Sequence, residues 1–206
     1  MAERAPRRIA DAGRGADVAG TVRLVTDRAA TSAATASTST SIPSRYLAID
    51  LGRSRLAAGV VDESGTVLVR DRVATPARHV WPTLVRLVHR VVAAAPDDVR
   101  PSACGVTCVG PVDHRDGSMT TVHMPSWEGF PLRSELEQVT GLPVSIDSAG
   151  RGLALAEWWC GHAVGLSDFV AILLGDEVDA GIVANGRLLD GRTGNVGQVG
   201  HLVVEP

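Results

Sequence analysis

Turns rich in acids and glycine follow two short apolar runs, and these are the places where this sequence could do chemistry. Residues 50–54 (Asp-Leu-Gly-Arg-Ser) close the first run, and residues 175–181 (Gly-Asp-Glu-Val-Asp-Ala-Gly) close the second. The first turn is not the G-x-G-x-x-G turn of a dinucleotide-binding sheet. The second brings together carboxylates, which divalent metals accept as ligands. It is therefore either a metal site or a solvated acidic turn, formed by Asp176, Glu177 and Asp179.

Other residue types set limits on the chemistry. All 20 basic residues are arginine, so mechanisms that need a lysine Schiff base or a P-loop lysine are absent. Cys104, Cys108 and Cys160 are too few and too unevenly spaced for a disulfide framework. A net charge of -3 gives no general attraction to nucleic acid or to an anionic membrane surface. No apolar run reaches the roughly 18 residues of a membrane span, and no secretory signal is visible, so we expect a cytoplasmic protein.

The first part of the 206-residue chain differs from the rest in composition. Residues 29–44 contain only Ala, Ser and Thr apart from Ile42 and Pro43, and such a tract has little to bury. We predict that residues 1–45 form a flexible, low-complexity arm. The arm is basic, so it is either a solvated leader or a tail that binds nucleic acid.

From Tyr46 onward, apolar runs alternate with helical periodicity. Helices are predicted where apolar residues recur at helical spacing between 81 and 92, and over 132–139 and 151–160. Asn185-Gly186 indicates a tight hairpin turn. The order of strands and helices is that of an α/β protein. The predicted strands span residues 46–51, 56–61, 66–73, 103–109, 143–146, 169–174 and 180–183.

Five segments, in the same order and with compatible spacing, resemble the ROK family of repressors and sugar kinases. Residues 47–55 (LAIDLGRSR) resemble its first phosphate loop, A-I-D-I-G-G-T-K. Residues 105–111 (GVTCVGP) resemble G-x-x-x-x-G-P-V, and residues 125–129 (PSWEG) resemble L-P-G-W-x-G. Residues 142–144 (LPV) with 153–157 (LALAE) frame the family helix N-D-A-x-A-L-A-L-A-E, and residues 194–201 (GNVGQVGH) resemble G-N-A-G-E-I-G-H.

The resemblance implies a fold and an activity. It implies the actin-like ATPase (ribonuclease H-like) α/β fold, with a first domain over 46–148 and a second domain that starts at 149 and is incomplete at 206. The family transfers the γ-phosphoryl group of ATP, with magnesium, to a hexose such as glucose. In its enzymes an aspartate accepts the hydroxyl proton and glycine turns hold the phosphates. A two-domain fold of this kind needs about twice the residues that follow the arm, so we expect a truncated chain.

The resemblance also assigns candidate binding residues. The phosphate-binding residues are Asp50, Gly52, Ser54 and Gly175, and Arg53 replaces a family glycine. The substrate-binding residues are Trp127, Ser148, Gln198 and His201. Trp127 is either a cleft residue or a packed aromatic. Four of the six histidines match no family motif and are predicted to lie on the surface: His79, His89, His114 and His162.

The catalytic position departs from the family pattern. The ungapped register places Ala149 where the proton-accepting aspartate is expected and Ser148 where an asparagine is expected. Asp147 is the candidate substitute base. On a strand it would share a face with position 149 but lie roughly 6.5 Å away, so that it needs a backbone shift, which Gly150 and Gly152 would permit.

The family's structural zinc site is also incomplete. His201 matches its histidine, but none of the three cysteines has the spacing of the family's C-x-C-G-x-x-G-C segment. One histidine alone cannot form a structural zinc site. Cys104 and Cys108 lie on a predicted buried strand and are expected in the core.

Three readings of function follow. The first is a sugar-kinase-like protein of the glucokinase type that is catalytically impaired, a pseudokinase. The second is a non-catalytic sugar-binding regulator related to the ROK repressors, against which stands the lack of a recognisable DNA-binding domain. The third is a truncated remnant without function. A hexose is the expected partner, homodimerisation is expected from the resemblance only, and no membrane or nucleic acid partner is expected.

Overall fold

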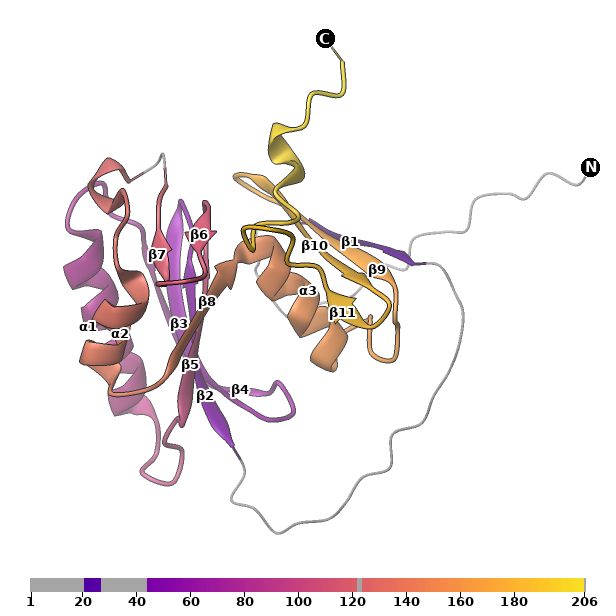
Figure 1. Cartoon of the computed structure of the whole chain (residues 1–206). Coiled ribbons are helices and arrows are strands. Elements are labelled where there is room, and N and C mark those ends of the chain that lie inside the picture. The colour runs from indigo at the N-terminus through magenta and orange to yellow at the C-terminus, as the bar shows by residue number, and fades with distance from the viewer. Residues whose placement is uncertain (1–20, 27–43, 122–123, 206) are drawn as a thin grey trace, which may run out of the picture.

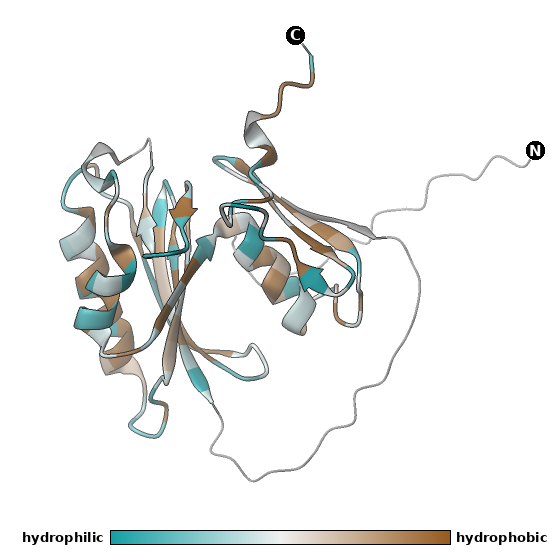
Figure 2. Ribbon diagram, in the orientation of Figure 1, coloured by the Kyte–Doolittle hydropathy of each residue, from teal (hydrophilic) through white to brown (hydrophobic). Residues whose placement is uncertain are grey.

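The computed structural model describes residues 21–26, 44–121 and 124–205, which fold into two lobes (Figure 1). Each lobe is a sheet covered by helix on one face. Apolar stretches lie along the strands and helices, whereas the turns between them are largely hydrophilic (Figure 2). Within the described residues, no helix is both long and apolar enough to cross a membrane.

The first lobe contains a five-stranded sheet in the order β4-β3-β2-β5-β8. In this sheet β2, β3 and β4 form an antiparallel meander, and β5 and β8 then add in parallel orientation. The helices α1 and α2 cover one face of this sheet (Figure 1). The bounds are β2 Arg45–Leu51, β3 Arg55–Asp62, β4 Val67–Ala74, α1 Val80–Ala94, β5 Ala103–Cys108, α2 Leu132–Thr140 and β8 Val144–Ser148.

Side-chain alternation explains how this sheet and its helices fit together. In β2, Leu47, Ile49 and Leu51 are buried, and the residues between them are only partly covered. The buried residues of α1 recur at helical spacing and meet the same core. The predicted strands and helices of this lobe are thus confirmed, with ends shifted by one or two residues.

The opposite face of the sheet carries small side chains. Together with Leu155 and Trp159 of α3 (Ala149–Cys160), it lines a groove of about 960 Å³. Leu155 and Trp159 are 42% and 48% exposed. The small residues along the groove are Ala48, Ala57, Gly59, Gly105 and Ser145.

The second lobe contains a four-stranded sheet in the order β1-β9-β10-β11, with α3 packed on β9 and β10. Asn185 and Gly186 both have positive φ in the turn between β10 and β11, which confirms the predicted hairpin. The bounds are β1 Thr21–Thr26, α3 Ala149–Cys160, β9 Phe169–Leu174, β10 Val178–Ala184 and β11 Arg187–Leu188.

Strand β1 differs from the sequence-based expectation. Residues 21–26 lie inside the predicted flexible arm, yet they form a strand that pairs antiparallel with β9, from Thr21 opposite Leu174 to Thr26 opposite Phe169. The segment TVRLVT is rich in residues that favour strands, and an open edge of β9 offers unpaired backbone groups. The rest of the predicted arm up to residue 43 lies outside the described residues.

Short elements complete the two lobes. The hairpin of β6 (Val112–Asp113) and β7 (Ser118–Met119) follows β5 along the chain. Two single turns of 3-10 helix, η1 (Pro125–Trp127) and η2 (Val199–His201), lie in the first and second lobes. The β6–β7 hairpin was not predicted, because strands of two residues leave no periodicity to read.

The three cysteines should differ sharply in reactivity. Burial raises the pKa of the Cys104 and Cys108 thiols to about 12, whereas Cys160 is exposed. Only the thiolate attacks thiol reagents. We therefore expect one fast-reacting thiol per folded chain with a disulfide reagent at pH 8, and three after denaturation. The variant Cys160→Ser should lose the fast phase; a fast phase that survives this change would contradict the assignment.

Candidate functional site

The turn between β2 and β3 forms one wall of the candidate site. The N–H of Gly52 donates to the carbonyl of Arg55 at 2.9 Å, and a Cβ at position 52 would lie 2.7 Å from that oxygen. Glycine is therefore required here for steric reasons. The hydroxyl of Thr75 donates to the carbonyl of Gly52 at 2.8 Å and fixes the turn. Arg53 and Ser54 are exposed, so this turn presents a guanidinium and a hydroxyl to solvent.

Asp50, Thr107 and Asp147 form a row across neighbouring strands. Asp50 lies opposite Thr107 in the β2–β5 pair, and Thr107 lies opposite Asp147 in the β5–β8 pair. The Thr107 hydroxyl donates to Asp50 Oδ1 at 3.1 Å. Burial raises the pKa of Asp50, although the hydrogen bond from Thr107 and the charge of Arg55 act in the opposite direction. The row therefore places two carboxylates at the edge where the two lobes meet.

The start of α3 is occupied by structural hydrogen bonds. Ser148 is the N-cap: its hydroxyl accepts from the N–H of Arg151 at 3.4 Å, and the residue is 2% exposed. Ala149 is the first helical residue. The N–H of Gly150 donates to Asp179 Oδ2 at 2.7 Å. A carboxylate at this end of a helix is favourable because the unpaired N–H groups carry partial positive charge.

The residues of the acidic turn, 175–181, therefore have different roles. Asp179 caps α3, which is neither of the two roles considered for it from the sequence. Gly175 and Asp176 are exposed at the tip, and the N–H of Gly175 donates to the carbonyl of Glu177 at 3.1 Å. Among the residues that the structure describes, no three His, Cys, Asp or Glu side chains come together as a metal site.

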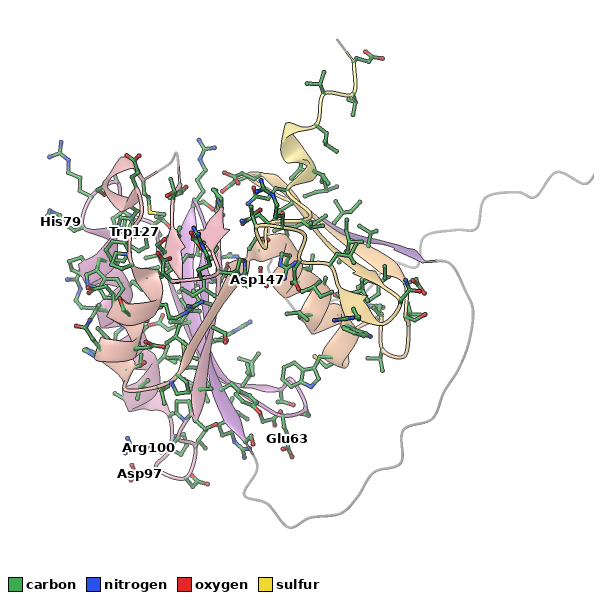
Figure 3. All side chains as sticks on the ribbon, in the orientation of Figure 1. Glu63, His79, Asp97, Arg100, Trp127 and Asp147 are labelled. Carbon is green, nitrogen blue, oxygen red and sulfur yellow. The ribbon has the colours of Figure 1, made fainter. Side chains whose placement is uncertain are left out.

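Arg151 is a buried cation that the sequence analysis did not identify. Its side chain is 4% exposed. Nε donates to Asp147 Oδ1 at 2.6 Å, Nη2 donates to Asp190 Oδ1 at 2.7 Å, and Nη1 donates to the carbonyl of Leu189. Burial alone would lower the pKa of Arg151, but the hydrogen bonds to Asp147 and Asp190 more than offset this and raise it. The same network occupies Asp147, the predicted substitute base. Asp147 lies where the two lobes meet (Figure 3).

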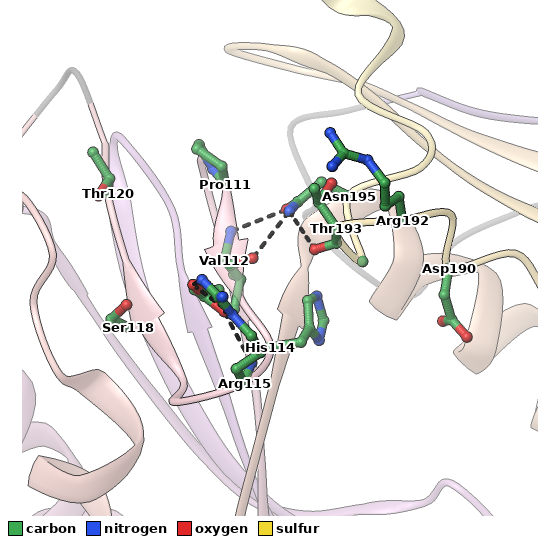
Figure 4. A pocket seen from close by; sticks show the side chains of 12 residues that line it. Pro111, Val112, His114, Arg115, Ser118, Thr120, Asp190, Arg192, Thr193 and Asn195 are labelled. Carbon is green, nitrogen blue, oxygen red and sulfur yellow. Dashed lines mark hydrogen bonds and ion pairs between the residues drawn. The ribbon is translucent and has the colours of Figure 1, made fainter.

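His114 is the second residue that sequence reasoning missed. It was predicted as a surface residue, but its side chain is 31% exposed and Nε2 lies 3.8 Å from Asp147 Oδ1. The hairpin β6–β7 carries it toward the cleft between the lobes (Figure 4). The reason for the error is that this contact depends on how the hairpin folds over the end of β8, which no local pattern reveals.

A polar cavity of about 840 Å³ lies beside His114, between the β6–β7 hairpin and residues 190–195. Asn195 closes one side, because its amide pairs with the backbone of Val112. Oδ1 accepts from the Val112 N–H at 3.0 Å, and Nδ2 donates to the Val112 carbonyl at 2.9 Å (Figure 4). This pair of hydrogen bonds ties the segment after β11 to the first lobe.

The predicted substrate residues that the structure describes lie in different environments. Gln198 is partly exposed at the start of η2, and the side chain of His201 lies outside the described part of the chain. Trp127 is 4% exposed and stacks on Phe130 with ring centroids 4.3 Å apart, with Trp81 at 6.4 Å. The indole is therefore packed in an aromatic cluster of the first lobe, the second of the two environments considered for it.

Known proteins share this arrangement over most of the chain. The family model for the ROK family matches residues 46–206. A glucokinase from Thermotoga maritima is 29% identical over 163 residues, which is 79% of this chain and 51% of the relative. The chain spans about half the length of the curated relatives it matches.

Two solved structures extend the comparison. The ROK family glucokinase from Streptomyces griseus, in complex with glucose and AMPPNP, is 31% identical with a TM-score of 0.70; the match covers 79% of this chain and 51% of that one. A ROK family transcriptional regulator, a homolog of the E. coli MLC protein, is 26% identical with a TM-score of 0.64; the match covers 79% and 42%. The chain belongs to the ROK family and has the actin-like α/β fold of its sugar kinases.

Proposed function

We propose that this chain is a sugar-kinase-like protein that binds a hexose between its lobes and transfers the γ-phosphoryl group of ATP at a strongly reduced rate. The observation that carries the reduced rate is Ala149 at the first position of α3. The register of the family motif puts the proton-accepting aspartate there, and a methyl group accepts no proton. General-base catalysis typically contributes about 10²- to 10⁴-fold to such a reaction.

Neighbouring side chains do not replace the missing carboxylate directly. Ser148 is buried as a helix cap. Asp147 Oδ1 accepts from Arg151 at 2.6 Å and from the Ser148 N–H at 2.8 Å. For Asp147 to act as the base by itself, it would have to leave the buried Arg151 without its partner, and breaking a buried ion pair typically costs about 3–5 kcal/mol.

The nucleotide side of the proposal rests on the two turns. The β2–β3 turn offers Gly52, Ser54 and the exposed Arg53, and Asp50 lies just behind it. The β9–β10 turn offers Gly175, with Asp176 beside it. Magnesium keeps most of its ligands as water and phosphate oxygen, so a single carboxylate such as Asp50 fits an ion that ATP brings with it. The described residues do not fit a structural zinc.

The hexose side of the proposal rests on Gln198 and His201. The amide of Gln198 can both donate to and accept from sugar hydroxyls, and the residue is partly exposed. A role of Trp127 in hexose binding stays a prediction, and it would require the aromatic cluster around Trp127 to open. We place the protein in the cytoplasm and expect homodimers, both from family membership alone.

A non-catalytic sugar-binding regulator is the second candidate function. It is supported by Ala149 and by the likeness to a ROK transcriptional regulator. Hexose binding without any turnover would favour it. A remnant without function is the third reading, which a broad and uncooperative thermal melt without hexose binding would favour.

Restoring the carboxylate should restore the rate. We expect Ala149→Asp to raise kcat for ATP-dependent hexose phosphorylation by about 10²- to 10⁴-fold with little change in the hexose KM. An acid at the first position of α3 is also compatible with the helix dipole. A coupled assay that follows ADP release measures the effect. Ala149→Asn is the matched control, because it has the same shape without the base; equal rates for the two variants would contradict the proposal.

Removing the amide of Gln198 should weaken hexose binding. We expect Gln198→Ala to raise the Kd measured by titration calorimetry about tenfold, the loss of about one hydrogen bond to a sugar hydroxyl. Gln138→Ala makes the same chemical change on the exposed side of α2 and should leave the Kd unchanged. Equal effects of the two substitutions would remove Gln198 from the site.

A further inference from the structure

The imidazole of His114 is held in a fixed place at the cleft. The residue follows β6, and its ring lies between Asp147 of the first lobe and Gly194 of the segment after β11. Gly194 has φ +79°, and a Cβ there would overlap the His114 ring. Glycine at 194 therefore serves two purposes: it permits the left-handed backbone and it leaves room for the ring.

One ring nitrogen of His114 is buried without a partner. Among the described residues, Nε2 has no hydrogen-bond partner although it is shielded from solvent. Asp147 Oδ1 lies 3.8 Å from it. This separation is too long for a hydrogen bond. The other nitrogen, Nδ1, lies on the opposite side of the ring, and the side chain lines the polar cavity of about 840 Å³.

Charged groups surround His114 on several sides. Asp147 faces the ring directly, and Arg151 lies beyond it, paired with both Asp147 and Asp190. On the hairpin itself, Asp113 and Arg115 pair with each other. From α2, Arg133 donates to the His114 carbonyl at 3.2 Å, so this guanidinium holds the backbone of the histidine.

We propose that His114, oriented by Asp147, is the proton acceptor of the residual phosphoryl transfer and takes the place of the carboxylate missing at Ala149. This inference rests on the proposed function. Asp147 acts as a positioning residue: its carboxylate faces Nε2 and stabilises the imidazolium by its charge, while it remains bonded to Arg151. The ion pair between Asp147 and Arg151 is thus kept. It would have to break if Asp147 itself were the base.

The reaction balances with ATP as the only co-reactant. The hexose hydroxyl oxygen forms a bond to the γ-phosphorus of ATP, and its proton passes to Nδ1 of His114. The bond between the γ-phosphorus and the β,γ-bridging oxygen breaks, and ADP leaves with that electron pair. The imidazolium then loses its proton to water, which regenerates neutral His114 for the next turnover.

The test compares full-length variants in the coupled ATP and hexose assay. We expect His114→Ala and His114→Gln to lower the residual kcat at least tenfold without changing the hexose Kd from calorimetry. Imidazole added to His114→Ala should restore part of the rate. The pH profile of the residual rate should change in His114→Ala. His89→Ala on the exposed side of α1 is the matched control and should leave the rate unchanged.

A second pair of variants separates this inference from the proposed function. We expect Ala149→Asp to turn over equally well with or without His114→Ala, because the carboxylate then accepts the proton. Unchanged kcat and pH profile in His114→Ala would overturn the role of His114 and leave the proposed function standing. Turnover in Ala149→Asp with none in the natural chain would also overturn the role of His114, and it would favour the non-catalytic regulator. No turnover in any variant, together with no hexose binding, would overturn the proposed function and this inference with it.

Discussion

One buried guanidinium holds the junction of the two lobes together. Arg151 makes three directed hydrogen bonds, to a carboxylate on β8, to a second carboxylate after β11 and to a main-chain carbonyl beside it. The planar fork of arginine suits this task, because a lysine ammonium would not present fixed donors in three directions. Burying a charge is unfavourable unless it is paired and hydrogen-bonded, so this side chain helps to set the positions of β8, α3 and the segment after β11 relative to one another.

The same interaction decides what the neighbouring acids can do. Asp147 is committed to Arg151, Ser148 to the helix cap, and Asp179 to the N–H of Gly150. Polar side chains at the start of α3 therefore build the junction instead of facing a substrate. A histidine supplied by a separate hairpin is the group in this region that keeps an unmatched nitrogen next to a carboxylate. The polar residues at the start of α3 thus have structural roles, whereas the β6–β7 hairpin supplies the candidate proton acceptor.

Local patterns predicted the local elements well. The apolar run over residues 46–51 predicted a buried strand, in which every second residue is in fact buried, and the apolar spacing between 81 and 92 predicted α1. The motif residues also gave the family. Contacts across long stretches of chain were not predictable: β1 pairs with β9 from far away in the sequence, and His114 reaches Asp147 only once the β6–β7 hairpin folds. For Trp127, composition allowed both a cleft and a core position, and only the stacking on Phe130 decides between them.

Asn195 contributes its side chain to the contact with Val112, whereas Val112 contributes only its main chain. The amide of Asn195 supplies both a donor and an acceptor, whereas Val112 contributes only main-chain groups that almost every residue possesses. As far as this contact is concerned, any residue except proline serves at position 112, while very few side chains serve at 195. A single substitution of Asn195 can therefore break this contact between the lobes, whereas nearly all substitutions of Val112 preserve it. A sequence comparison that looks for paired changes would not detect it.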